Sequence, residues 1–160
     1  MIWTASRNQE QGALVAGLYQ RAGAVLCERQ AVMAGGLPGA DKASAFAQVG
    51  IDPDRYLVIS IDRILVGMAE CGMIPAVPRL SPLEAADLVH GEAQFLAKCL
   101  GLRALGDGRN ILWDISVASQ HAVESWLEAH RQAGYEVTGL FIEISIEESV
   151  RRSEAAHRHG

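Results

Sequence analysis

A short apolar run, Gln30–Ala34, passes directly into the glycine-rich segment Gly35–Ser44. An uninterrupted apolar run of this kind is typical of a strand that is buried on both faces of a parallel sheet. Further strands are predicted at Tyr56–Ser60, Asn110–Asp114 and Glu136–Ile144. Segments with helical periodicity separate these strands. The alternation predicts an α/β fold of three layers, with a mainly parallel sheet flanked by helices.

Capping signals and apolar periodicity define the predicted helices. Ser81–Glu84 is a capping box with proline at the first helical position, and the helix that it opens should run to about Leu105. Its buried face is predicted from apolar residues at steps of three and four, namely Ala86, Val89, Ala93, Leu96 and Leu100. Other helices are predicted over Asn8–Arg21, Asp62–Cys71 and Ser119–Ala133, and a last helix opens at Ser145.

The glycine-rich segment is similar to a phosphate-binding loop, which reads G-x-x-x-x-G-K-[ST]. In such a loop, backbone N–H groups hold the phosphates of ATP, the lysine reaches the β- and γ-phosphate oxygens, and the hydroxyl binds Mg²⁺. Gly36 and Lys42 stand at the first glycine and the lysine of this pattern. The candidate residues for binding ATP with Mg²⁺ are Gly36, Gly39, Ala40, Asp41, Lys42, Ala43 and Ser44. A glycine-rich turn between a strand and a helix, without a ligand, is the alternative.

Two positions of the loop depart from the working pattern. Asp41 replaces the second glycine, and Ala43 replaces the residue whose hydroxyl binds Mg²⁺. A carboxylate beside a phosphate group repels it, and the repulsion grows with the number of phosphate charges. A water molecule, or Ser44 one residue further on, would replace the lost metal ligand imperfectly. We therefore expect weak binding of Mg·ATP, and no residue is assigned as a metal ligand from the sequence.

From about Gln30 to Gly160 the chain resembles the zeta-toxin family of P-loop kinases, particularly its actinobacterial members. The matching segments follow the order of that family and are Ala34–Gly39, Gly72–Pro75, Leu80–Ala85, Leu88–His90, Ala104–Asn110, Ile111–Asp114, Ala133–Val137 and Ser149–Arg152. The length of 160 residues is usual for one domain, so residues 1–160 are expected to form a single domain with an N-terminal helical segment at 1–29. The resemblance implies a P-loop NTPase-like kinase core at 30–160.

The resemblance also implies a function. Zeta toxins phosphorylate the 3′-hydroxyl of UDP-N-acetylglucosamine with ATP, and an antitoxin protein is an expected partner. A non-catalytic remnant or binding module is one alternative, and a P-loop kinase of another small hydroxylated acceptor is a second. Members of the family continue beyond the end of this chain, so its C-terminal part is expected to be shortened.

The resemblance implies roles for three residues near predicted strand ends. Lys42 matches the phosphate-loop lysine and is expected to act in catalysis. Asp62 matches the aspartate that orients or deprotonates the sugar hydroxyl, a role suited to a carboxylate within hydrogen-bond reach, and a helix N-cap is the alternative. Asp114 matches an acidic position that holds the sugar nucleotide. A role beside the metal ion and a solvated strand-end carboxylate are the alternatives for Asp114.

Charged residues on two helices complete the implied site. Arg152 and Arg158, with Arg151, match a basic segment that contacts the ATP phosphates as a lid. Favourable placement of cations late in a helix is the alternative for these arginines. His90 and Glu92 lie near a His-x-Glu pair of the family and are candidate substrate-binding residues, although a pair on the helix surface is the simpler interpretation.

Composition argues against several classes of partner. The net charge of −5 offers no general basic face for nucleic acid. The N-terminal residues lack a signal-peptide pattern, and no apolar run reaches the roughly 18 residues that a membrane span needs. A cytoplasmic protein without membrane contacts is therefore expected. Cys27, Cys71 and Cys99 form no CxxC pair, so they are expected to be buried free thiols.

Overall fold

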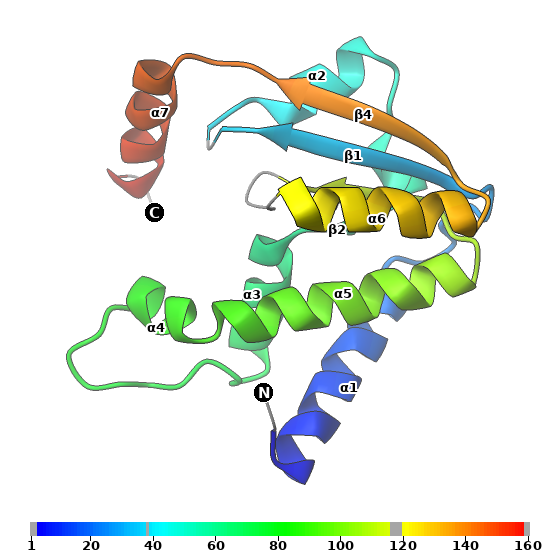
Figure 1. The fold of residues 1–160 in the computed structure, drawn as a ribbon. Coiled ribbons are helices and arrows are strands. Elements are labelled where there is room, and N and C mark those ends of the chain that lie inside the picture. The colour runs from blue at the N-terminus through cyan, green and yellow to red at the C-terminus, as the bar shows by residue number, and fades with distance from the viewer. Residues whose placement is uncertain (1–2, 38, 116–119, 159–160) are drawn as a thin grey trace.

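The computed structural model describes residues 3–37, 39–115 and 120–158. It has an α/β fold in which helices flank a four-stranded sheet, which confirms the fold class expected from the sequence (Figure 1). The strands are β1 (Gln30–Gly36), β2 (Leu57–Ile59), β3 (Ile111–Asp114) and β4 (Glu136–Ile142), in the spatial order β2-β3-β1-β4. Neighbouring strands pair in parallel, so their carboxyl ends lie at one edge of the sheet.

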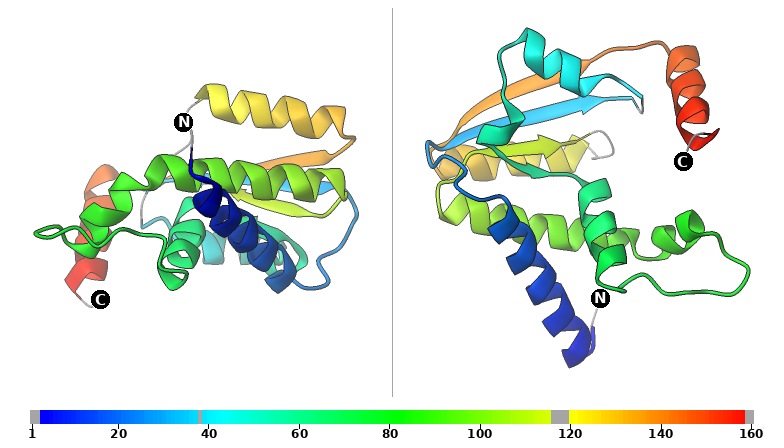
Figure 2. Two further views of the ribbon diagram at one scale, coloured as in Figure 1. Left: turned by 90° about the horizontal axis from the view of Figure 1, so that it is seen from below. Right: turned by 180° about the vertical axis from the view of Figure 1, so that it is seen from behind.

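Helices cover both faces of this sheet. They are α1 (Ala5–Arg21), α2 (Lys42–Gln48), α3 (Ile61–Glu70), α4 (Pro82–Leu88), α5 (His90–Gly106), α6 (Gln120–Gln132) and α7 (Ile146–Arg158), and a 3₁₀ helix (Pro53–Arg55) precedes β2. On one face, α3, α5 and α6 build the larger core with the strands, and α1 packs against α3 and α5 (Figure 2). α2 lies on the other face, where Phe46 packs in a smaller core with Val32 and Leu112.

The central position of β1 explains its continuous apolar run. β1 lies between β3 and β4, and residues 31–36 are all buried. The strand continues beyond the predicted end at Ala34 because Gly35 and Gly36 still pair with Phe141 and Ile142 of β4. The phosphate-binding loop predicted from the sequence therefore begins at the carboxyl end of a buried central strand.

The long helix predicted from Ser81 is divided into two. The capping box is confirmed, because Glu84 N donates to Ser81 Oγ and the Glu84 carboxylate accepts from Ser81 N at 2.8 Å. α4 ends at Leu88, and Val89 (φ −105°, ψ 7°) leaves the helical conformation before α5 begins at His90. Val89 is only 8% exposed. The apolar periodicity therefore runs through the break and conceals it in the sequence.

The cysteines are free thiols, as expected, but the prediction that they are buried is wrong. Cys27 and Cys71 are exposed and Cys99 is half-buried. Cys27 lies in the connection between α1 and β1, and Cys71 forms the C-cap of α3, so both lie outside the packed faces of the elements. Within the described ranges, no helix is long and apolar enough to cross a membrane. Those ranges also contain no group of three or more His, Cys, Asp or Glu side chains placed to hold a metal ion.

Candidate functional site

Close packing fixes the glycine-rich loop between β4 and α7. A Cβ atom at Gly36 would lie 2.9 Å from the carbonyl oxygen of Ile142. A Cβ atom at Gly39 (φ 76°) would lie 2.9 Å from Cβ of Arg152. Both positions therefore require glycine. The loop backbone lies at the carboxyl edge of the sheet, where parallel α/β folds bind their ligands.

Asp41 is the N-cap of α2. Its Oδ1 accepts a hydrogen bond from the backbone N–H of Ser44 at 3.0 Å, and its Oδ2 accepts from the Ser44 hydroxyl at 2.5 Å. These bonds hold the pKa of Asp41 below its usual value, with the Ser44 hydroxyl as the larger cause. The Asp41 carboxylate thus accepts a hydrogen bond from a backbone N–H near the start of α2. It also accepts one from the Ser44 hydroxyl, which the sequence suggested as a substitute metal ligand.

Lys42 and Asp114 meet between the loop and the end of β3. Lys42 Nζ lies 3.1 Å from Asp114 Oδ2, and the two side chains are 23% and 24% exposed. The pairing of β1 with β3 sets Asp114 opposite Ala34, next to the loop. Asp114 is therefore not a freely solvated strand-end carboxylate. Because the lysine charge is balanced within the chain, a phosphate group would compete with Asp114 for it.

Asp62 lies in the first turn of α3, directly after β2, and is exposed. The N-cap of this helix is Ser60, whose hydroxyl accepts from Arg63 N at 3.2 Å. The alternative that Asp62 serves as the N-cap is therefore wrong. Asp62 stands at the same edge of the sheet as Asp114, one strand further from the loop.

The α7 helix brings an arginine to the loop. Arg152 Nη1 donates to the carbonyl oxygen of Gly39 at 3.1 Å, and Arg152 Nε donates to Glu148 Oε1 at 2.5 Å. Arg151 also binds Glu148, at 2.7 and 2.8 Å, and together the two arginines lower the pKa of Glu148 to about 2. Both arginines lie in the middle of α7, so placement late in a helix does not explain them. Arg158 is the last residue of α7.

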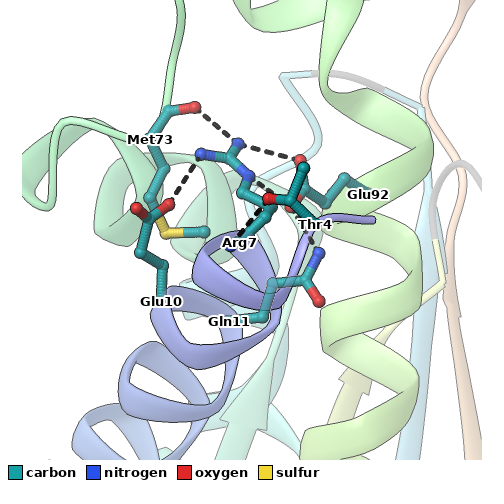
Figure 3. A network of polar contacts seen from close by, with 6 residues as sticks. All are labelled: Thr4, Arg7, Glu10, Gln11, Met73 and Glu92. Carbon is teal, nitrogen blue, oxygen red and sulfur yellow. Dashed lines mark hydrogen bonds and ion pairs between the residues drawn. The ribbon is translucent and has the colours of Figure 1, made fainter. Parts of the chain in front are cut away.

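Glu92 is buried between α5 and α1, which contradicts the interpretation that it lies on the helix surface (Figure 3). Its two carboxylate oxygens accept from Arg7 Nε at 2.8 Å and Nη2 at 2.9 Å, and Oε1 also accepts from Gln11 Nε2 at 2.6 Å. Although burial raises the pKa of Glu92, these hydrogen bonds hold it below its usual value. Arg7 Nη2 donates to the carbonyl oxygen of Met73 at 2.6 Å, which ties the loop after α3 to the same network.

His90, the other member of the predicted pair, is the first residue of α5 and is half-buried. It lies at the break between α4 and α5, and Glu92 lies in the following turn. Glu92 binds side chains of α1. The network in Figure 3 thus attaches the N-terminal helix to the rest of the fold. Through these contacts, α1 packs as part of the fold.

A cavity of about 350 Å³ opens at the carboxyl ends of β2 and β3, between α5 and α6. Its lining residues come from five elements and their connections, and they are Ile59, Ser60, Ile61, Gln94, Ala97, Lys98, Trp113, Asp114, Ile115, Ala122 and Trp126. The cavity thus reaches Asp114 and the two residues that precede Asp62. Sequence reasoning gave it no role.

Two tryptophans form one wall of this cavity. The rings of Trp113 and Trp126 lie 4.3 Å apart, measured between centroids. His130, which is fully buried, accepts a hydrogen bond from Trp113 Nε1 at 3.1 Å, and its Nδ1–H donates to the carbonyl oxygen of Trp126 at 2.7 Å. Burial lowers the pKa of His130, which favours this neutral form. Gly101 makes room for the Trp113 ring, because a Cβ atom there would lie 2.3 Å from Cη2.

The fold is similar to solved structures of two kinds. A chain of the PezAT chromosomal toxin–antitoxin system of the human pathogen Streptococcus pneumoniae matches with a TM-score of 0.76 at 16% identity, over 98% of this chain and 64% of that one. Chains of the AvrRxo1-ORF1:AvrRxo1-ORF2 complex, crystallised with sulphate ions and with ATP, match with TM-scores of 0.65 at 16% and 15% identity. These matches cover 94% of this chain and 50% and 49% of the others.

At these identities the likeness establishes the fold. The chain spans less than two thirds of the length of the structures that it matches. No protein-family model matches the chain, and no curated protein sequence is significantly similar to it.

Proposed function

We propose that the chain is a zeta-toxin-like phosphotransferase with an impaired ATP site. The observation that carries the proposal is the 3.1 Å ion pair between Lys42 and Asp114, which lies between the glycine-rich loop and the cavity. The loop would hold the phosphates of the donor, and the cavity would hold an acceptor with a hydroxyl group. The similarity to a chain of a toxin–antitoxin system and to a complex crystallised with ATP supports this assignment.

In the proposed reaction, the acceptor oxygen attacks the γ-phosphorus of ATP, the bond to the β-phosphate oxygen breaks, and ADP leaves. Asp62 would accept the hydroxyl proton, since it is exposed and follows Ser60 and Ile61 of the cavity. Lys42 and Arg152, with Arg158, would stabilise charge on the transferred group. Mg²⁺, as implied by the family resemblance, would neutralise part of the phosphate charge.

The impairment would arise from charges that the chain already balances. Asp41 places a carboxylate in the loop and engages Ser44, and Ala43 offers no ligand to Mg²⁺. Lys42 is paired with Asp114, and Arg152 is held by Glu148. Each ATP phosphate would therefore have to break an internal ion pair or approach a carboxylate.

For the acceptor, the family resemblance implies the 3′-hydroxyl of UDP-N-acetylglucosamine. Asp114 is the proposed substrate-binding residue that lines the cavity. His90 and Glu92 are the other candidates, but Glu92 binds Arg7 and Gln11, which supports a structural role for it. Another small hydroxylated acceptor is the second candidate, and the apolar lining of the cavity favours it.

Partners and cellular location also belong to this proposal. A zeta-toxin-like activity would call for an antitoxin protein that keeps the enzyme inactive. We place the protein in the cytoplasm, where ATP and sugar nucleotides are available. We treat residues 1–160 as one domain, because α1 packs against α3 and α5 of the kinase-like core.

Binding of Mg·ATP tests the proposed impairment. Asp41→Gly combined with Ala43→Ser should tighten binding about tenfold or more, because it removes the repulsion from a carboxylate and restores a metal ligand. Glycine is itself tolerated at a helix N-cap, so α2 should remain intact. Isothermal titration would compare the two proteins.

Lys42→Ala provides the control for this binding experiment. Added to the double variant, it should abolish the gain, because the lysine is the loop's proposed contact with the β- and γ-phosphates. Equal affinity of the native chain and the double variant would show that the loop is not impaired.

A further inference from the structure

We propose that the cavity beside Asp114 binds a neutral molecule with a flat apolar ring and a hydroxyl group, rather than a nucleotide diphosphate. This ligand would be the acceptor of the proposed phosphotransferase, so its phosphorylation rests on the proposed function. Its binding to the cavity can be measured without phosphoryl transfer. A cavity of about 350 Å³ lies within the size range of small-molecule sites.

The lining of the cavity is predominantly apolar. The apolar members are Ile59, Ile61, Ala97, Trp113, Ile115, Ala122 and Trp126, and the polar members are Ser60, Gln94, Lys98 and Asp114. Such a lining stabilises a ligand chiefly by removing its apolar surface from water. The few polar groups would orient the ligand and select its hydroxyl group.

The charges around the cavity disfavour a diphosphate. Lys98 is the single cation among the described lining residues, and it lies on the exposed side of α5. Asp114 is the single carboxylate among the described lining residues, and Lys42 already balances its charge at 3.1 Å, so the pair offers a phosphate no net positive charge. Burying a diphosphate here would remove its water shell without supplying the cations that normally replace it. A neutral ligand avoids this penalty.

The tryptophan wall points to a flat ring. Aromatic faces favour offset stacking with other planar groups. Trp113 is only 5% exposed and is fixed by His130, whereas Trp126 is half-buried and also lines the cavity. A wall that is already ordered loses little conformational freedom when a ligand binds. A ligand stacked on Trp126 could direct a hydroxyl group toward the end of β3, where Lys42 meets Asp114.

Titration with phenyl β-D-glucopyranoside tests the inference. This neutral probe carries a flat phenyl ring and several hydroxyl groups, and isothermal titration of the full chain without ATP should show saturable binding. Ala122→Leu should weaken binding about tenfold or more, because the added methyl groups fill the cavity. Ser125→Leu is the matched control on the exposed side of the same helix, and it should leave the affinity unchanged.

A second variant protects the test against a folding defect. Trp126→Leu removes the stacking surface and should also weaken binding of the probe about tenfold. UDP-N-acetylglucosamine should bind the native chain no more tightly than the probe does. The inference is overturned if the probe does not bind, if neither cavity variant weakens it, or if the sugar nucleotide binds at least tenfold more tightly. The titration contains no ATP, so it measures binding alone. A later failure to detect phosphoryl transfer would refute the proposed function but would not affect the binding result.

Discussion

Replacing Glu92 with alanine should lower the free energy of unfolding by about 3–5 kcal/mol, because it breaks a buried ion pair and leaves its partners unsatisfied. Glu92 is 6% exposed, and its carboxylate accepts two hydrogen bonds from Arg7 and one from Gln11. Without it, the guanidinium of Arg7 and the buried amide of Gln11 would lose their main acceptor. Urea denaturation at neutral pH measures the difference.

Glu10→Ala is the matched control for this prediction. Glu10 pairs with the same Arg7 at 3.2 Å, but its side chain is 48% exposed. An exposed pair of this kind contributes about 0–1 kcal/mol. Equal losses of stability in the two variants would contradict the conclusion that burial of Glu92, rather than its charge alone, attaches α1 to the fold.

Replacing Gly101 with alanine should also destabilise the protein, by about 1–3 kcal/mol, because it overpacks the core. The new Cβ atom would lie 2.3 Å from Cη2 and 2.4 Å from Cζ2 of Trp113. Trp113 cannot move freely, since His130 and Trp126 hold it from other sides. We therefore expect lower stability together with a changed near-ultraviolet circular dichroism spectrum.

Gly106→Ala tests whether the effect is specific to this contact. Gly106 belongs to the same helix, but no atom lies within 4 Å of a Cβ atom built there. Alanine is favoured over glycine in a helix by about 0.5–1 kcal/mol, so this variant should be neutral or slightly more stable. A similar loss of stability in both variants would mean that α5 tolerates no substitution of glycine, and that the contact with Trp113 is not the cause.

Much of the architecture was predictable because the relevant signals are local. The apolar run before Gly35 specified the central strand, and parallel strands bring their carboxyl ends to one edge. Asp114 could therefore be expected near the glycine-rich loop. The ion pair between Asp114 and Lys42 could not be predicted, because it depends on which strand lies beside β1 and on the path of the loop.

The errors arose where one pattern hides another. Val89 continues the apolar stripe through the point where α4 ends, so periodicity alone extends the helix. Glu92 lies next to Ala93 and one turn before Leu96, on the buried stripe, and this position was the available signal that it needs a cationic partner. Arg7 supplies that partner from a helix distant in sequence, which no local pattern reveals.

The cavity could not be predicted from the sequence, for a different reason. Its tryptophan wall depends on space left by Gly101 and on a hydrogen bond from Trp113 to His130, and these residues belong to three separate elements. In the sequence each one reads as an ordinary core or helix residue. A cavity is formed by what neighbouring elements leave empty, and residue patterns along one element do not record it.

We propose that the chain has a kinase-like site and that Asp41 and Ala43 impair it. The most direct test is transfer of labelled γ-phosphate from Mg·ATP to phenyl β-D-glucopyranoside and, in parallel, to UDP-N-acetylglucosamine. The native chain would be compared with the Asp41→Gly, Ala43→Ser variant, and with the same variant carrying Asp62→Asn. We predict slow transfer by the native chain, transfer at least about tenfold faster by the double variant, and loss of the gain with Asp62→Asn. Equal rates for the native chain and the double variant, or no transfer by either, would contradict the proposed function.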